Sequence, residues 1–197
     1  MTDDHTLASL IGSRICHDLI SPIGAITNGL ELLQMSGEVS SPEMALIGES
    51  VESASARLRF YRIAFGSAGD QMVGAPEVQA ILRDLFESSR LNVSWTPTTP
   101  KPRAAVRLAF LAILCMENGM PYGGTLTISC ESSAWKLHGQ ADRLNIDKTI
   151  WPLLTTDSDH VGLQPAHVQF ALLPMIASDD GRTVATDIGV NEITLSF

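Results

Sequence analysis

The sequence has little cysteine, little positive charge and no long hydrophobic run, and each shortage excludes a class of protein. Its three cysteines are an odd number without CxxC spacing, so neither a disulfide framework nor a zinc site is indicated. The formal net charge of −9 disfavours binding to nucleic acid or to an anionic membrane surface. The longest apolar run, residues 108–116, is too short to span a bilayer, and the N-terminus lacks the basic region of a secretory signal. We therefore expect a cytoplasmic protein.

What the chain does have is enough apolar sequence for a folded core. Of its 197 residues, 45% are hydrophobic, which suffices for one domain of good size or two small ones. Residues 7–35 and 44–65 each predict a long helix, because apolar or small side chains recur there in steps of three and four. Serine, glycine and proline between them predict a tight turn. We expect an antiparallel hairpin whose apolar stripes are completed by a second copy, giving a dimeric four-helix bundle.

The helical pattern stops in small and polar residues at 66–70, which predicts a boundary between a helical domain (1–68) and a second domain (69–197). In the second domain the patterns predict helices over 75–89, 104–117 and 165–176, strands over 92–96, 125–130, 134–139, 183–186 and 192–197, and a proline-rich loop over 97–102. The expected fold class is α+β, with a mostly antiparallel sheet.

The position of His17 on the first helix is the most informative feature of the chain. At about 100° per residue, apolar residues lie on the side opposite His17, and small or polar residues flank it. The opposite set is Ile15, Leu19, Ile26, Leu30 and Leu33, and the flanking set is Ser13, Ser21, Gly24 and Asn28. The imidazole is therefore expected to face solvent or a partner rather than the core.

The residues around His17 resemble a known motif. His17, Asp18 and Leu19, with Pro22 five residues after the histidine, resemble the phosphoacceptor motif in the dimerisation domain of sensor histidine kinases. The predicted helix over 104–117, followed by Asn118, resembles the asparagine-containing segment of the kinase ATP-binding fold. The sequence contains no glycine-rich box of the DxGxG kind, however. The whole pattern is therefore similar to the ChpT-type family of histidine phosphotransferases, which are built like kinases but have lost ATP binding.

This resemblance implies both a fold and an activity. It implies a C-terminal α/β sandwich like a degenerate kinase ATPase domain, and a homodimer that relays a phosphoryl group between the aspartates of receiver domains through His17. The receivers would belong to response regulators and to a hybrid histidine kinase. No cofactor or metal is expected on this chain, and Mg²⁺ is expected in the acidic pocket of the partner receiver.

The resemblance and the helix geometry together select the candidate site residues. The catalytic candidates are His17 and Asp18, where Asp18 would keep the imidazole nucleophilic or would simply be an exposed carboxylate. The candidates for partner binding are Ser13, Arg14, Ile20, Ser21 and Gly24, on or near the His17 face. Pro22 is expected to bend the helix just below His17, because it lacks an N–H and crowds the carbonyl of residue 18.

Two other functions remain open at this point. One is an active histidine kinase with a divergent nucleotide site. Because glycine-rich partners are missing, we expect Asn118 to cap the helix or form a turn rather than to be a remnant of a nucleotide site. The other is a non-catalytic protein that docks on or inhibits kinases or receiver domains, with a binding that survives the loss of His17. Labelling from ATP would indicate the first, and binding without labelling would indicate the second.

Overall fold

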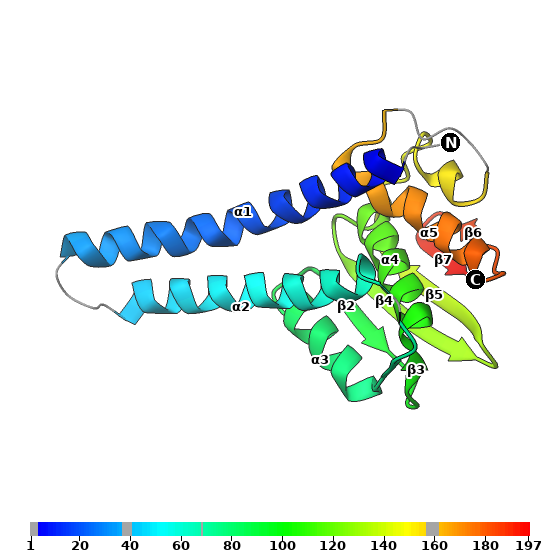
Figure 1. Cartoon of the computed structure of the whole chain (residues 1–197), viewed down its shortest axis with the longest axis horizontal. Coiled ribbons are helices and arrows are strands. Elements are labelled where there is room, and N and C mark those ends of the chain that lie inside the picture. The colour runs from blue at the N-terminus through cyan, green and yellow to red at the C-terminus, as the bar shows by residue number, and fades with distance from the viewer. Residues whose placement is uncertain (1–3, 37–40, 68, 157–161) are drawn as a thin grey trace.

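The computed structural model describes residues 4–36, 41–67, 69–156 and 162–197. Its N-terminal part consists of two long helices, α1 (Asp4–Ser36) and α2 (Ser41–Ala64), which lie side by side and project from the rest of the chain (Figure 1). The sequence predicted both helices to within three residues at each end, so the helical hairpin is confirmed. The turn expected between them falls mainly on residues 37–40, outside the described residues.

The hairpin is buried mainly at the end where it meets the C-terminal half. There Phe60 of α2 is fully buried and stacks on Phe110 of helix α4 (Arg103–Gly119), with ring centroids 4.4 Å apart. Farther along the hairpin, Leu32 and Val51 remain about half exposed. One chain therefore leaves part of the predicted apolar stripes uncovered.

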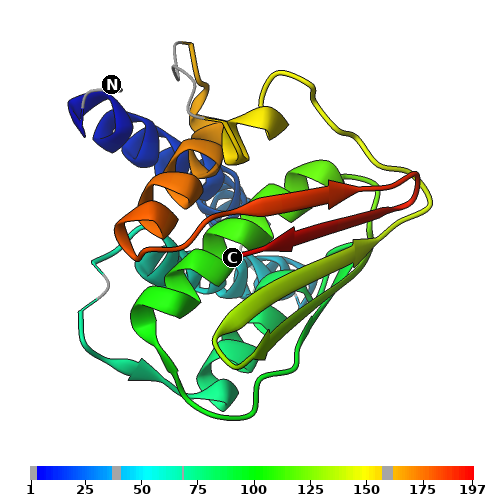
Figure 2. The same cartoon turned by 90° about the vertical axis from the view of Figure 1, so that its right-hand side faces the viewer.

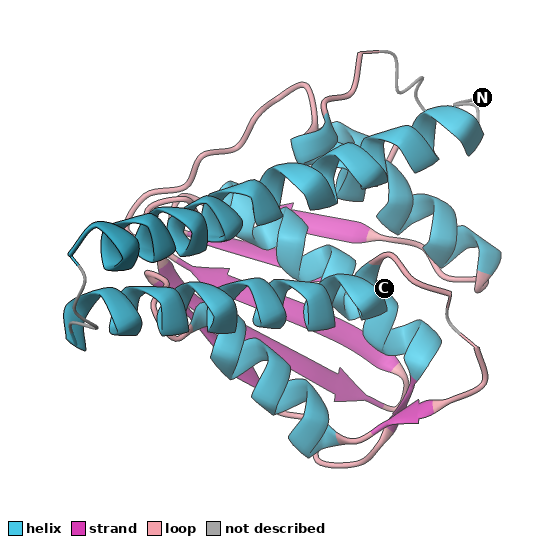
Figure 3. Cartoon of the chain, turned by 60° about the vertical axis from the view of Figure 1, so that its left-hand side comes forward, coloured by secondary structure: helices cyan, strands magenta, loops and turns pink. Residues whose placement is uncertain are grey.

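The C-terminal half is a five-stranded sheet with helices packed on one face (Figures 2 and 3). Its strands follow the order β2-β4-β5-β7-β6, and the bounds are β2 (Leu91–Trp95), β4 (Gly124–Glu131), β5 (Ala134–Gln140), β6 (Ala185–Ile188) and β7 (Glu192–Ser196). The covering helices are α3 (Ala75–Phe86), α4 and α5 (Val168–Asp179). Only β2 and β4 run parallel, and the other neighbouring strands are antiparallel. The predicted α+β class is confirmed.

Helix α4 is the centre of the core. From Val106 to Met116 nearly every side chain except Arg107 is buried, because this helix contacts the hairpin, α5 and the sheet at once. A helix that is apolar around most of its circumference is suited to such a place. Its last turn, with Glu117 and Asn118, emerges from the core beside the hairpin and lines the cavity described below.

The predicted loop over 97–102 is wrong at its end. Residues 101 and 102 form a short strand, β3 (Lys101–Pro102), which pairs with β1 (Met72–Val73). The amide of Arg103 extends this pairing by donating to the carbonyl of Gln71. Strands of two residues are too short to show an alternating pattern, so the sequence could not reveal them.

The predicted helix over 165–176 and strand over 183–186 are shifted in the structure. The helix begins with a single 3₁₀ turn, η2 (Pro165–His167), before α5 starts, since Pro165 fits the first position of a helical turn. The strand lies two residues later, as β6. The structure also contains a 3₁₀ turn that the sequence did not predict, η1 (Trp151–Leu154).

The predicted division into residues 1–68 and 69–197 stays a prediction, and residue 68 itself lies outside the described residues. The base of α2 packs tightly on α3 and α4, so the hairpin and the C-terminal half share one core cluster. None of the helices described here is long and apolar enough to cross a membrane.

Gly123, just before β4, occupies a backbone conformation and a tight space that favour glycine. Its φ is +98°, and a Cβ at this position would lie 2.4 Å from the carbonyl oxygen of Arg90. Gly181 also has a positive φ, +68°, but has nothing within 4 Å of the same position. We expect Gly181→Ala to cost about 1–2 kcal/mol of unfolding free energy, and Gly123→Ala to cost about 1–3 kcal/mol more because backbone must also move. Urea denaturation of the two variants checks this, and equal losses would contradict it.

Candidate functional site

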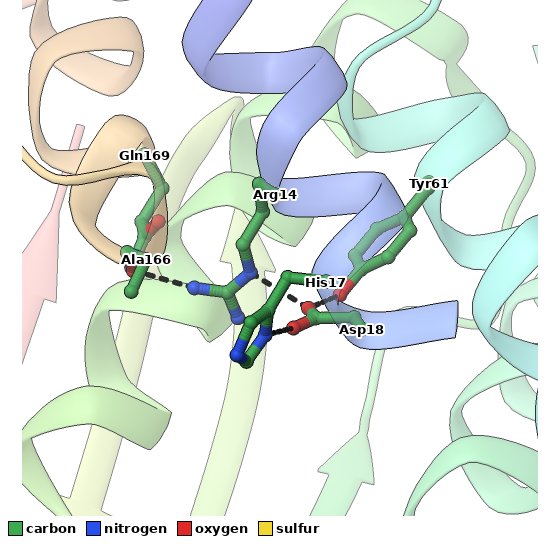
Figure 4. Close-up of polar contacts among 6 residues, drawn as sticks. All are labelled: Arg14, His17, Asp18, Tyr61, Ala166 and Gln169. Carbon is green, nitrogen blue, oxygen red and sulfur yellow. Dashed lines mark hydrogen bonds and ion pairs between the residues drawn. The ribbon is translucent and has the colours of Figure 1, made fainter. Parts of the chain in front are cut away.

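His17 is exposed on α1, as the sequence predicted. Its side chain retains 83% of its accessible surface, and its Nδ1 lies 3.1 Å from Oδ1 of Asp18 (Figure 4). This is the single hydrogen bond recorded for the ring among the described residues. Because an ionised carboxylate only accepts hydrogen bonds, this contact requires a proton on Nδ1, and in the neutral ring Nε2 then keeps its lone pair.

The sequence left two interpretations of Asp18 open, and one of them, an exposed carboxylate, is wrong. Only 11% of its side chain is accessible, and Oδ2 accepts hydrogen bonds from both Arg14 and Tyr61. Arg14 lies one turn earlier on α1, at 2.7 Å, while Tyr61 comes from α2. The carboxylate therefore links the two helices of the hairpin and presents its remaining oxygen to His17 (Figure 4).

Arg14 also connects the hairpin to the C-terminal half. One of its terminal nitrogens donates to the carbonyl oxygen of Ala166 in η2. Gln169 donates to the same carbonyl at 3.1 Å. The Arg14 side chain is only 16% exposed and is turned toward these internal acceptors. Its role in partner binding stays a prediction.

The electrostatics of the cluster follow from burial and hydrogen bonding. Burial acts to raise the pKa of Asp18, but hydrogen bonds from Tyr61, His17 and Arg14 outweigh it, and the pKa falls below its usual value. Burial, followed by the hydrogen bond to Asp18, raises the pKa of Tyr61 to about 12. At neutral pH the cluster therefore holds a carboxylate, a guanidinium and a neutral phenol.

The other predicted site residues lie around His17 on α1. Ser13, Ile20 and Ser21 are exposed, with Ile20 retaining 68% of its surface, and Gly24 is partly exposed with open space where a Cβ would project. Helix α1 continues through Pro22 without interruption. The predicted bend at Pro22 and the binding roles of its neighbours stay predictions.

A cavity of about 420 Å³ lies between the hairpin and the C-terminal half, beside Asp18. Its polar lining is Arg14, Asp18, Arg57, Tyr61, Ser88, Ser89, Glu117, Asn118 and Gln169. Although solvent reaches Glu117, the protein around it raises its pKa by desolvation, and Arg14 and Arg57 oppose this only in part. Asn118 belongs to the last turn of α4 and not to a turn beyond it.

Sequence reasoning missed Tyr61 and Glu117 as members of this cluster. Tyr61 falls at an apolar position of the repeat over residues 44–65, and Glu117 ends the predicted helix over 104–117, so neither pattern indicates a site residue. Two arginines of α2 have other surroundings: Arg59 pairs with Asp84 at 2.9 Å, and the Nε of Arg57 has no hydrogen-bond partner in the described structure. In the same described part of the chain, no group of three His, Cys, Asp or Glu residues could hold a metal ion.

An exposed histidine on a helical hairpin, next to a largely buried carboxylate and followed by an α+β domain, is the arrangement expected of a histidine phosphotransfer protein. The family model for the histidine phosphotransferase C-terminal domain matches residues 75–192, and the chain belongs to this family. The family resemblance noted in the sequence is thereby confirmed.

Similar proteins agree with this assignment. The chain is 40% identical over 130 residues to the protein phosphotransferase ChpT of Brucella abortus, and the match spans 64% of this chain and 62% of that protein. It also superposes on a solved bacterial phosphotransferase with a TM-score of 0.85 and 30% identity, covering 100% of this chain and 97% of the other. A histidine kinase domain from Erythrobacter litoralis aligns over 97% of this chain and 91% of its own length, but with 11% identity and a TM-score of 0.46. That similarity is too low to assign a function.

The raised pKa of Tyr61 predicts a loss of stability in alkali. The folded protein binds the phenolic proton more tightly than the unfolded chain does, so this contribution is complete below about pH 10, where an unfolded tyrosine titrates. It is lost as the pH rises through the folded pKa of about 12. With two tyrosines in the chain, absorbance titration at 295 nm of wild type and Tyr61→Phe assigns the transition. A Tyr61 transition near pH 10 would contradict the buried hydrogen bond.

Proposed function

We propose that this protein is a histidine phosphotransferase that relays a phosphoryl group between the aspartates of receiver domains through His17. The observation that carries the proposal is the exposed imidazole of His17, whose Nδ1 is held by the largely buried carboxylate of Asp18. This arrangement leaves Nε2 unprotonated and accessible, as a nucleophile near neutral pH requires. The phosphotransferase relatives support the same reaction class.

In the forward step, Nε2 of His17 attacks the phosphorus of an aspartyl phosphate on the donor receiver. The new N–P bond forms as the acyl O–P bond breaks, and the aspartate leaves as a carboxylate with the bonding electron pair. The phosphorylated ring retains its Nδ1 proton and carries a positive charge, which the carboxylate of Asp18 stabilises. Attack by the aspartate of an acceptor receiver reverses these changes, so the same geometry serves both halves of the relay.

The surface around His17 suits the approach of a folded partner. Ser13, Ser21 and Gly24 have small side chains, and Ile20 offers an exposed apolar contact. In this proposal a response regulator or the receiver of a hybrid kinase docks there and brings its own Mg²⁺, which neutralises charge on the transferring group. A relay between receiver domains would operate in the cytoplasm.

The hairpin also supports a homodimer. Five apolar side chains of the hairpin are each about half exposed in a single chain: Leu30, Leu32, Met44, Val51 and Leu58. Apolar side chains repeated along two antiparallel helices are suited to pack on the same surface of a second copy. The result would be a four-helix bundle.

Phosphoryl transfer tests the role of His17 directly. We expect label from a ³²P-phosphorylated receiver domain to appear on the wild-type protein but not on His17→Gln, which keeps a polar side chain and lacks the nucleophile. His138→Gln is the matched control, because His138 lies on β5 and bonds Thr194, away from the hairpin. This variant should label like wild type.

Labelled ATP with Mg²⁺, tested in parallel, distinguishes the competing functions. Label from ATP in the absence of any receiver would indicate a kinase and would overturn the relay. Binding of receivers or kinases with no label from either source would instead indicate a docking or inhibitory protein.

If the half-exposed apolar side chains of the hairpin form the dimer interface, a charge among them should lower the mass of the assembly in solution. A charge at Val51, which is 47% exposed in the single chain, should break a bundle that buries it, since burying an unpaired carboxylate is unfavourable. We expect light scattering to give a dimer for wild type and a monomer for Val51→Glu. Val190→Glu is the control, because Val190 is 90% exposed beyond β6. Unchanged dimer mass for Val51→Glu would contradict this interface.

A further inference from the structure

Tyr61 is a buried polar side chain that the proposed transfer has not yet used. It lies on α2, is 5% exposed, contacts the rings of Phe60 and Phe65, and donates its hydroxyl hydrogen to Oδ2 of Asp18. A phenylalanine would fill the same space on apolar grounds alone. The hydroxyl therefore contributes a hydrogen bond to Asp18 and is not needed for the packing of the core.

The direction of the Asp18 carboxylate is determined by the donors around it. Arg14 and Tyr61 both bind Oδ2, and they approach from different helices. Arg14 lies on the same helix as Asp18, so by itself it does not link the carboxylate to α2, whereas Tyr61 does. With Oδ2 held from both sides, Oδ1 is left facing Nδ1 of His17.

His17 depends on this constraint because its own side chain is almost entirely in solvent. An exposed imidazole samples several rotamers and both neutral tautomers unless a partner selects one. Asp18 Oδ1 selects the tautomer with the proton on Nδ1. If the Asp18 carboxylate changes orientation, the orientation and tautomer of the His17 ring are therefore expected to change with it.

We propose that Tyr61 is a positioning residue for phosphoryl transfer: by holding Oδ2 of Asp18, its hydroxyl directs Oδ1 to Nδ1 of His17 and keeps Nε2 free to attack. This inference rests on the relay proposed above. Tyr61 itself touches neither the phosphoryl group nor the receiver, and it changes no bond in the reaction.

The test removes one oxygen atom. Tyr61→Phe retains the ring contacts with Phe60 and Phe65, and Tyr122→Phe makes the same change at an exposed tyrosine that packs on Arg143. Single-turnover transfer from a ³²P-labelled receiver is measured over a range of receiver concentrations. We expect Tyr61→Phe to lower the limiting rate by about tenfold, as for the loss of one hydrogen bond to a charged group. The concentration for half-maximal rate should stay unchanged, and Tyr122→Phe should match wild type.

A second measurement separates positioning from general damage to the fold. With ¹⁵N-labelled histidine, two-bond ¹H–¹⁵N spectra report which ring nitrogen of His17 carries the proton, and His17→Gln assigns the signal among the five histidines. We expect Nδ1–H in wild type and a mixture of tautomers in Tyr61→Phe. A merely structural role would lower stability and leave the tautomer unchanged.

The outcomes distinguish this inference from the function on which it rests. If wild type labels and His17→Gln does not, while Tyr61→Phe keeps both the wild-type rate and the wild-type tautomer, the positioning role is overturned and the relay stands. A lower rate with an unchanged tautomer also overturns it. If wild type itself takes no label from any receiver, the relay fails first, although the tautomer spectra still report whether Tyr61 orients His17.

Discussion

The carboxylate of Asp18 is the group on which the rest of the site depends. It is largely buried, so its negative charge has to be compensated by donors inside the protein. Those donors come from α1, through Arg14, and from α2, through Tyr61, and Arg14 in turn reaches the carbonyl of Ala166. Two helices therefore meet at this charge, and a third segment is linked to it through Arg14.

This arrangement reconciles two opposed requirements on His17. In the proposed relay His17 has to be exposed to reach a folded partner, and an exposed side chain loses a defined direction. Here the ring is in solvent while its hydrogen-bond partner is largely buried. The surrounding hydrogen bonds keep Asp18 ordered, and the imidazole that would act as the nucleophile stays accessible.

The sequence predicted the elements of this site better than their contacts. The hairpin, the sheet class and the exposure of His17 follow from periodicity, which depends on short segments alone. The pairing of Arg14 with Asp18 was also within reach, because residues four apart on a helix face each other. The contact of Tyr61 with Asp18 could not be predicted, because a tyrosine at an apolar position of the α2 repeat does not indicate which acceptor its hydroxyl will bind. The carbonyl of Ala166 carries no side-chain signal at all.

The C-terminal half has a structural task that does not depend on whether it binds a nucleotide. Phe110 of α4 stacks on Phe60, the residue next to Tyr61, and so fixes the part of α2 from which the hydroxyl projects. Ala166 supplies the acceptor that turns Arg14 inward toward Asp18. A hairpin without this support would expose Phe60 and leave Arg14 with one fewer acceptor. The geometry at His17 is therefore a property of the whole chain, although the ring itself projects from a single helix.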